Sequence, residues 1–283
     1  CTGRAFAEYV REHLLEPLDI DRATFDDTAF AMDDDHMTQY LIEDGSPTAA
    51  SLPAADLTRS ATGLLASPRH LAALLRLYLN DGHYAGTAVV AEDGLRTARE
   101  SPVETATGTT GYGWRVRSVC DWTVFERAGD IAVSGGYAGF APEAGVGVAL
   151  ATNSVPEVSL RALGTGVFAC VFGESPADAV PELARRRQFE RLVGHYRSHR
   201  GVRRARVGRD GGALQIEYET PLKTGSHSLV PVETDDGTPG DGEINEFTLS
   251  DAAGDRQPVR FDTSADPTTL DVDGWRLHRT DGR

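Results

Sequence analysis

The residue pattern changes from helix-like to strand-like at Gly111 and returns to helix-like at Leu160, and this order constrains the fold most. Residues 112–119 (YGWRVRSV) and 122–129 (WTVFERAG) carry alternating or β-branched and aromatic residues, which predicts two strands. Residues 145–154 (GVGVALATNS) are typical of a buried strand. Helices before and after antiparallel strands predict an α+β domain in which helices pack on a sheet.

The helices flanking these strands have clear sequence limits. Ser67 is a suitable N-cap, Pro68 suits the first helical position, and Gly82 suits the C-terminal end of the clearest helix. The acidic stretch before that helix, about forty residues ending near Pro53, is predicted to be a loop that covers a site. The predicted helices cover residues 3–16, 67–82, 89–100 and 160–173.

A change of composition near residue 174 divides the chain. Residues 174–188 (beginning ESPADAVP) are predicted to form a linker and the start of a helix. Beyond them, short strand-like runs alternate with turn pairs such as Asp210-Gly211, which predicts a small antiparallel all-β domain over 189–283. Residues 1–173 form the preceding α+β domain.

The charge is strongly acidic, with a net value of −15, and Lys223 is the only lysine among 28 basic residues. Acidity with almost no lysine favours adaptation to high salt, because concentrated salt screens self-repulsion. An arginine-biased genome is the alternative explanation. In either case, an acidic surface argues against nucleic acid or an anionic membrane as the main partner. No apolar run is long enough to span a membrane.

The sequence predicts no metal, cofactor or disulfide. The cysteines at 1, 120 and 170 lack metal-site spacing, and Cys120 and Cys170 are expected to be small buried residues. His195 and His199 have a spacing that binds metal on a helix face, but a solvated surface pair is favoured. The triplet 33–35 (DDD) is interpreted as a solvated run. A local cluster of arginines is interpreted as a charged face that balances an acidic neighbour rather than a phosphate site; its members are Arg185, Arg186, Arg187, Arg191, Arg197, Arg200, Arg203, Arg204 and Arg206.

Three segments, in the same order, resemble class C-like serine β-lactamases and penicillin-binding proteins. Residues 3–25 (GRAFAEYVREHLLEPLDIDRATF) resemble the helix and turn that follow the family's Tyr-x-Asn motif, and 61–82 (ATGLLASPRHLAALLRLYLNDG) resemble its "aGGL.sta.Dla.f" helix. The stretches YGWRVR, SGGYAGF and GVGVALATNS resemble its closing "YG.GW…HsGg..GF…G..vvlTN" segment. The resemblance covers about residues 1–170. It implies acyl transfer on amide or ester bonds of β-lactams, peptides or small esters.

The resemblance implies a serine nucleophile in Ser-x-x-Lys, but this chain has no such motif. Lys223 begins a KTG triplet, which is interpreted as a coincidental turn in the β domain because it lies far beyond the family's TN strand. No catalytic residue is therefore assigned. A remnant of the family's third motif, which forms part of the substrate pocket, is placed at Val133, Ser134, Gly135, Gly136 and Tyr137.

Two departures from the family pattern argue against activity. Val133 stands where the family carries Lys or His, and valine can neither move a proton nor attract a carboxylate. Phe140 is followed at once by APEAGVGV, so about one strand is expected to be missing. The chain is thus predicted to be a truncated, catalytically incompetent serine hydrolase whose unpaired sheet edge promotes association.

Three alternatives remain open. In the first, the chain is one half of an active hydrolase that an upstream segment completes, with a small molecule or peptide as substrate. In the second, it is a non-enzymatic binding or scaffold protein built on the same fold. In the third, it is a degenerate remnant. Members of such families are commonly exported or associated with the cell envelope, but residues 1–10 (CTGRAFAEYV) carry no signal for it.

Overall fold

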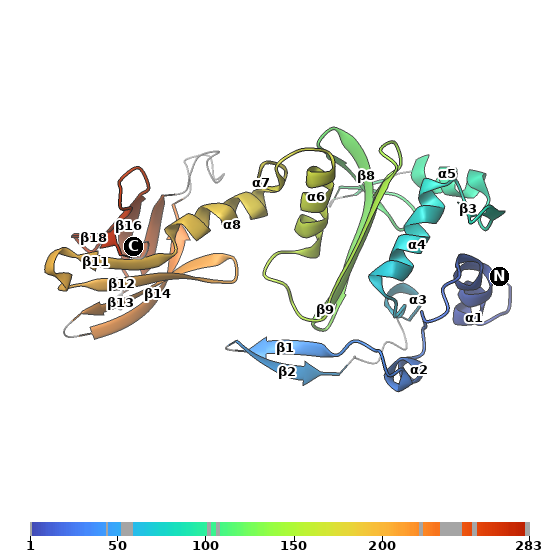
Figure 1. Ribbon diagram of the computed structural model, residues 1–283, viewed down its shortest axis with the longest axis horizontal. Coiled ribbons are helices and arrows are strands. Elements are labelled where there is room, and N and C mark those ends of the chain that lie inside the picture. Colours follow the sequence, from blue (N-terminus) through green and yellow to red (C-terminus); the bar gives the residue numbers. More distant parts are fainter. Residues whose placement is uncertain are drawn as a thin grey trace. The chain divides into compact units, whose positions relative to one another are not determined.

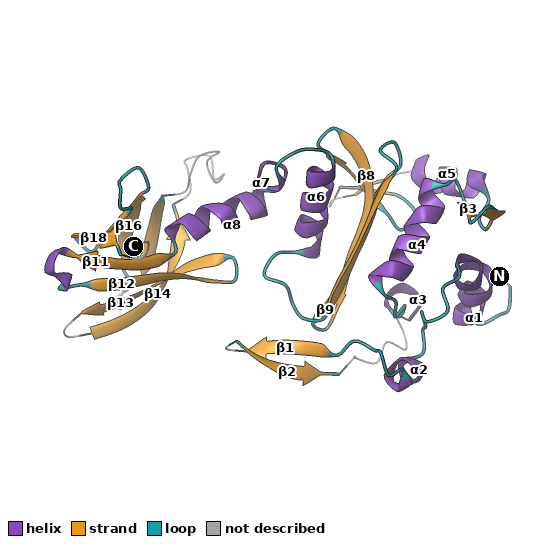
Figure 2. Ribbon diagram, in the orientation of Figure 1, coloured by secondary structure: helices purple, strands orange, loops and turns teal. Residues whose placement is uncertain are grey.

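The computed structural model describes residues 2–43, 45–51, 59–100, 103–105, 108–220, 223–232, 245–250 and 254–280. The chain forms two compact units, Cys1–Val180 and Pro181–Arg283. The first unit combines helices with a sheet, and the second is built mainly of strands (Figure 2).

The first unit alternates short helical pieces with strands (Figure 1). Its helical elements are α1 (Phe6–Val10), η1 (Arg11–Leu15), η2 (Glu16–Leu18), α2 (Asp27–Met32), α3 (Arg59–Thr62), α4 (Pro68–Leu79), α5 (Glu92–Glu100), α6 (Leu160–Val171) and α7 (Pro176–Ala179). Its strands are β1 (Gln39–Glu43), β2 (Ser46–Ala50), β3 (His83–Tyr84), β4 (Thr87–Ala88), β5 (Val103–Thr105), β6 (Gly108–Thr110), β7 (Arg115–Val119), β8 (Trp122–Ile131), β9 (Ser134–Ala141) and β10 (Val146–Thr152).

A six-stranded antiparallel sheet in the order β10-β9-β8-β7-β6-β5 organises this unit. Helix α6 packs on one face of the sheet and α4 on the other (Figure 1). Successive strand residues point to opposite faces, so Phe125 and Phe140 join Leu75 of α4, whereas Val124 lies with Phe168 of α6. The α+β arrangement of helices on an antiparallel sheet is therefore confirmed.

Helix α4 begins as the sequence predicts. The Ser67 side chain accepts a hydrogen bond from the His70 amide, the Ser67 amide donates to Nδ1 of the His70 ring, and Pro68 occupies the first turn. Gly82 follows with a φ of 87°, a left-handed conformation that glycine adopts without steric cost. The chain then turns into the short β3–β4 hairpin.

The acidic stretch before α4 is not a continuous loop, so that expectation is wrong. The Asp26 side chain accepts hydrogen bonds from the amides of Thr28 and Ala29 and thereby caps α2. Strands β1 and β2 then pair as an antiparallel hairpin. Within the stretch, residues 44 and 52–58 lie outside the described residues.

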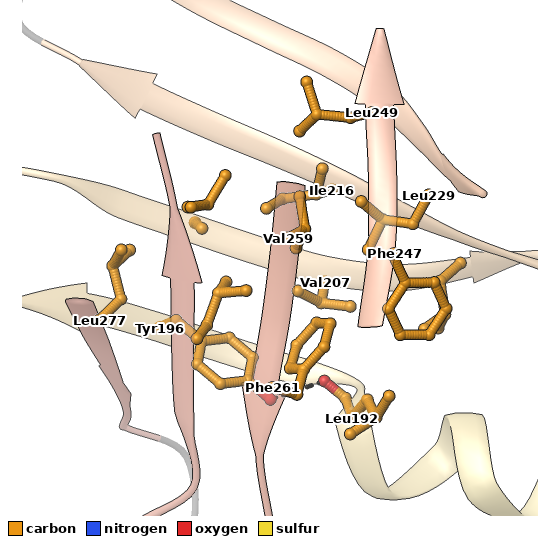
Figure 3. Close-up of a cluster of buried hydrophobic side chains, with 14 of the residues drawn as sticks. Leu192, Tyr196, Val207, Ile216, Leu229, Phe247, Leu249, Val259, Phe261 and Leu277 are labelled. Carbon is orange, nitrogen blue, oxygen red and sulfur yellow. Dashed lines mark hydrogen bonds between the residues drawn. The ribbon is translucent and has the colours of Figure 1, made fainter. Parts of the chain in front are cut away.

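The second unit is a closed antiparallel barrel of eight strands preceded by a helix. Side chains that alternate inward along the strands fill its interior together with Phe189 and Leu192 of the helix (Figure 3). The hydroxyl of Tyr196 donates a hydrogen bond of 2.7 Å to the Leu192 carbonyl, which satisfies both buried groups. Its elements are α8 (Pro181–Leu192), β11 (Gly194–Ser198), η3 (His199–Gly201), β12 (Arg204–Asp210), β13 (Ala213–Thr220), β14 (Lys223–Pro231), β15 (Glu246–Ser250), β16 (Arg256–Asp262), β17 (Thr269–Val272) and β18 (Trp275–Arg279).

Candidate functional site

The stretch predicted to hold the third-motif remnant runs from a turn into a strand. Val133 and Ala132 form the two-residue turn that joins β8 to β9, and Val133 is half-buried there. The next four predicted residues, 134–137, begin β9. Because neighbouring strand residues face opposite sides, these positions do not line one surface.

Gly135 and Tyr137 face helix α6. A Cβ on Gly135 would lie 2.7 Å from Leu160 Cδ1, and one on Gly164 of α6 would lie 2.3 Å from the Tyr137 ring. Tyr137 is only 1% exposed, so its ring fills a slot that the absence of a side chain at Gly164 leaves open. Tyr137 is thus a packing residue between sheet and helix in this structure, not a wall of an open pocket.

Ser134 and Gly136 face the opposite side of the sheet. Ser134 lies opposite Ile131 of β8, and Gly136 lies opposite Gly129. The Ser134 hydroxyl is buried and has no hydrogen-bond partner among the described residues. Among the five residues of the predicted remnant, only Ser134 and Gly136 point to the face of the sheet on which their β8 partners, Ile131 and Gly129, also lie.

A buried network of charged groups holds β8 against α6. The Glu126 carboxylate is fully buried and accepts hydrogen bonds from the Tyr137 hydroxyl at 3.0 Å and from Arg161 Nη1 at 2.9 Å. Arg117 Nε lies 3.5 Å from the same carboxylate, and Arg117 Nη2 donates to the Thr165 hydroxyl at 3.1 Å. Two guanidinium groups therefore offset the cost of burying Glu126.

The network also keeps Tyr137 protonated. Burial raises the pKa of the Tyr137 hydroxyl well above its usual range, and the neighbouring Glu126 carboxylate raises it further because it repels a phenolate. The neutral hydroxyl can then donate its proton to Glu126. This tyrosine is a hydrogen-bond donor to the network and not a proton acceptor.

Strand alternation directs the residue after Glu126 to the other face. Arg127 is exposed and lies opposite Ala138, on the same side as Ser134 and Gly136. Residues 127–129 read Arg-Ala-Gly, which is the basic–small–glycine order of the third motif in the resembled family. Sequence reasoning missed Arg127 because the Ser-Gly-Gly at 134–136 matches the motif's letters more closely.

Among the described residues, no further strand lies between Phe140 and the turn at residues 142–145, because β9 runs through Phe140 directly into that turn. Strands β8, β9 and β10 follow one another as a meander, paired continuously from Ile131↔Ser134 and from Ala141↔Val146. If Arg127 holds the place of the basic residue, β9 is the strand between the third motif and the turn at residues 142–145. The sequence feature that could have indicated this arrangement is the length of β8, which continues to Ile131.

The end of β8 has one open edge. Pairing between β7 and β8 stops at Arg115↔Glu126, whereas pairing with β9 continues to Ile131. Among the described strands, residues 127–131 of β8 thus have a partner on the β9 side only. An exposed strand edge with free backbone donors and acceptors can bind an extended peptide or acyl chain.

The other predicted features lie elsewhere. Lys223 lies in the barrel unit, as expected, but its KTG triplet forms the start of strand β14, paired with β13, and not the predicted turn. His195 lies on β11 and His199 in η3, so the two do not share a helix face. Cys170 is exposed on α6, which corrects the expectation that it is buried, and Cys120 is partly buried.

The described part of the chain offers no metal centre. Asp33 and Asp35 both accept hydrogen bonds from Arg22, so this acidic run is partly neutralised by a cation of its own. No group of three His, Cys, Asp or Glu residues in the described ranges is arranged to hold a metal ion. None of the helices described is both long and apolar enough to cross a membrane.

Two sequence families match the chain. The Beta-lactamase family matches residues 1–167, and the Pab87 octamerisation domain matches residues 176–278. No curated protein matches the chain.

A solved structure shows the same fold. The octameric penicillin-binding protein homologue from Pyrococcus abyssi superposes with a TM-score of 0.71 at 21% identity. That match covers 98% of this chain, and this chain spans 60% of the matched one. A crystal structure of SurE matches less well, with a TM-score of 0.47, 18% identity and coverage of 99% of this chain and 64% of that one.

The family match covers more than half of the chain and includes the α4 helix, the six-stranded sheet and the first part of α6, up to residue 167. The structural likeness extends over nearly the whole chain, barrel included. The chain belongs to the Beta-lactamase family and carries a second, barrel-forming unit that matches the Pab87 octamerisation domain.

Proposed function

We propose that the open edge of β8 at residues 127–129 is the substrate-binding edge of a serine acyl-transfer site. The observation that carries this proposal is the placement of Arg127: it is exposed, it follows the buried Glu126, and it lies on the strand segment whose outer edge has no described partner. The buried network behind β8 fixes the position of this edge. Such rigid support is what a binding strand requires.

Arginine at this position favours binding over proton transfer. A guanidinium stays charged at any physiological pH and grips a carboxylate with two parallel hydrogen bonds. It cannot act as a general acid or base, because it does not release its proton. We therefore expect Arg127 to hold an anionic group of the substrate, such as the carboxylate of a peptide or β-lactam.

The chain by itself is proposed to be incompetent for hydrolysis. Its 283 residues contain no Ser-x-x-Lys, and this motif supplies the attacking hydroxyl and its base in the resembled hydrolases. Reaction with a fluorescent penicillin or a fluorophosphonate tests this directly. We expect no stoichiometric labelling of the purified chain; one label per chain would contradict the proposal.

Substrate binding can be tested separately from turnover. We expect a carboxylate-bearing peptide to raise the melting temperature of the chain, and Arg127→Ala to abolish that shift. Arg69→Ala is the matched control, because Arg69 is exposed on α4 and its loss changes the net charge equally. An unchanged shift in Arg127→Ala would exclude Arg127 from the site. A ligand response without any turnover would instead favour the binding or scaffold role.

The second unit supports a second role, self-association. Residues 176–278 match a family described as an octamerisation domain, and the Pyrococcus abyssi homologue is octameric. We propose that the barrel brings copies of this chain together. Light scattering at several concentrations tests this: we expect a species larger than a monomer, and a monomer throughout would contradict it.

A further inference from the structure

Small residues form a row across three neighbouring strands beside Arg127. Gly129 of β8 lies opposite Gly136 of β9, and Gly136 lies opposite Ala151 of β10. Directly opposite residues in antiparallel strands point to the same face of a sheet. The small-residue strip is defined here as Gly129, Gly136 and Ala151. Because side chains alternate along a strand, Arg127 points to the same face as the strip.

The space above the strip is open. A Cβ placed on Gly129 or on Gly136 would meet no atom of the described residues within 4 Å, apart from its own chain neighbours. On the opposite face of β9, by contrast, a Cβ on Gly139 would lie 2.7 Å from the Tyr137 hydroxyl. Glycine inside a strand often marks a place where a ligand or another backbone approaches closely. The strip, unlike Gly139, has room for such a ligand.

Two further pairs flank the strip on the same face. Arg127 lies opposite Ala138 on one side of it, and Ile131 lies opposite Ser134 on the other. Ser134 is only 8% exposed, and its hydroxyl has no hydrogen-bond partner among the described residues. A buried hydroxyl of this kind costs free energy until a donor or acceptor reaches it. The strip therefore lies between a cation and a hydroxyl that can still accept a partner.

The open edge of β8 determines which ligand can use the strip. A peptide strand added to this edge places one residue opposite Arg127 and the residue two positions away opposite Gly129, both on the face of the strip. Neighbouring strands lie about 4.8 Å apart, so a long side chain opposite Gly129 extends over Gly129 toward Gly136. An aromatic ring can cover a glycine of a neighbouring strand in this way and buries a large apolar area.

We propose that the small-residue strip is a subsite for an aromatic side chain of an extended peptide whose acidic group, two residues away, binds Arg127. The inference rests on the substrate-binding edge proposed above and names the class of peptide that fits it, with acidic and aromatic residues at alternate positions. The residue between them points to the opposite face and does not contact the strip. Tyrosine fits best, because its ring covers the glycines and its hydroxyl brings a hydrogen-bonding group to the side of Ser134.

The test measures binding of short fluorescent peptides to the full chain by anisotropy. The reference peptides are amidated and threonine-rich, with a single glutamate and a tyrosine two positions before or after it, since a strand can be added in either direction. We expect one of the two orders to bind at least about tenfold more tightly than the same peptide with alanine in place of tyrosine. Moving the tyrosine to the position next to the glutamate should remove this gain, because the ring then points to the other face.

Gly136→Val fills the strip without touching Arg127. We expect it to reduce the gain from tyrosine to less than about twofold, while the alanine peptide still binds through its glutamate. Gly208→Val in β12 is the matched control, because a Cβ there also meets no atom of the described residues within 4 Å. It should retain the full gain. Circular dichroism establishes that both variants are folded, and Gly136→Ala provides a milder change at the same position.

The outcomes separate this inference from the proposed function. Equal affinity for the tyrosine and alanine peptides, with both still weakened by Arg127→Ala, would overturn the strip as a subsite and leave the substrate-binding edge intact. A gain from tyrosine that persists in Gly136→Val, or that survives the one-residue shift, would also overturn it. Peptide binding that Arg127→Ala does not weaken, or no binding of any peptide, would overturn the edge and the inference together.

Discussion

The hydroxyl of Tyr137 lies 3.0 Å from Oε2 of Glu126, and both residues are almost entirely buried between the sheet and α6. Arg161 and Arg117 reach the other carboxylate oxygen from α6 and β7. Three strands and a helix therefore meet at one carboxylate.

Removal of that carboxylate should be costly. We expect Glu126→Ala to lower the free energy of unfolding of the first unit by about 3–5 kcal/mol, because two guanidinium groups lose their shared anion in a buried site. Arg127→Ala is a control one residue away: its side chain is exposed, so its effect should stay within about 0.5 kcal/mol. Urea unfolding of both variants measures the difference. Equal effects would mean that β8 does not present these residues to opposite faces.

Stability should fall at alkaline pH because of Tyr137. Its folded-state pKa is raised, so the folded state keeps a proton that the unfolded chain loses above about pH 10. The free energy of unfolding should therefore be unaffected by this group at lower pH and should fall by up to about 1.4 kcal/mol per pH unit above that value. Tyr137→Phe should remove this component, whereas Tyr112→Phe, at a side chain that is 69% exposed, should retain it. Identical pH profiles for the two variants would refute the assignment.

The turn between β8 and β9 should tolerate glycine well. Ala132 has a φ of 53°, a left-handed conformation that costs an alanine about 1–2 kcal/mol. We expect Ala132→Gly to stabilise the first unit by about 0.5–1 kcal/mol after the entropic cost of glycine is included. The same change at Ala128, within β8, should destabilise it, because no such strain exists there to relieve. A thermal melt distinguishes the two directions.

The two units have separate cores, so a core mutation should affect one of them. Phe261 is 1% exposed inside the barrel, and Phe261→Ala should cost the barrel about 3–5 kcal/mol. Phe140→Ala should weaken the first unit by a similar amount. Scanning calorimetry should show a different transition shifted in each variant. A single transition that shifts equally in both would show that the units unfold together.

Much of the secondary structure was predictable because local chemistry decides it. The cap at Ser67, the aromatic and β-branched residues of β7 and β8, and the small-residue pattern of α6 each predict the element that forms. The acidic stretch was mispredicted because its helix is only six residues long and its hairpin contains Pro47 and Gly45. Short elements of this kind leave little periodicity to detect.

The candidate site was harder to place than the fold. Ser-Gly-Gly at 134–136 matches a motif by its letters, but only strand pairing shows that Arg127 rather than Val133 lies on the open edge. Two members of the arginine cluster, Arg197 and Arg204, likewise become neighbours only through the β11–β12 register, and Glu219 of β13 lies opposite Arg204 on its other side. Pairing partners across a sheet depend on tertiary structure, which a single sequence does not display.

The contact between Tyr137 and Gly164 has a consequence for comparing distant relatives. A side chain at 164 would overlap the tyrosine ring at 2.3 Å, so the two positions cannot change independently. A homologue that gains a side chain on this turn of α6 must have a small residue in place of the tyrosine, and one that keeps the tyrosine must keep the glycine. At sequence identities near 21%, this pair of positions can be used to align both β9 and α6 between two relatives, even where the residues between the two elements have diverged.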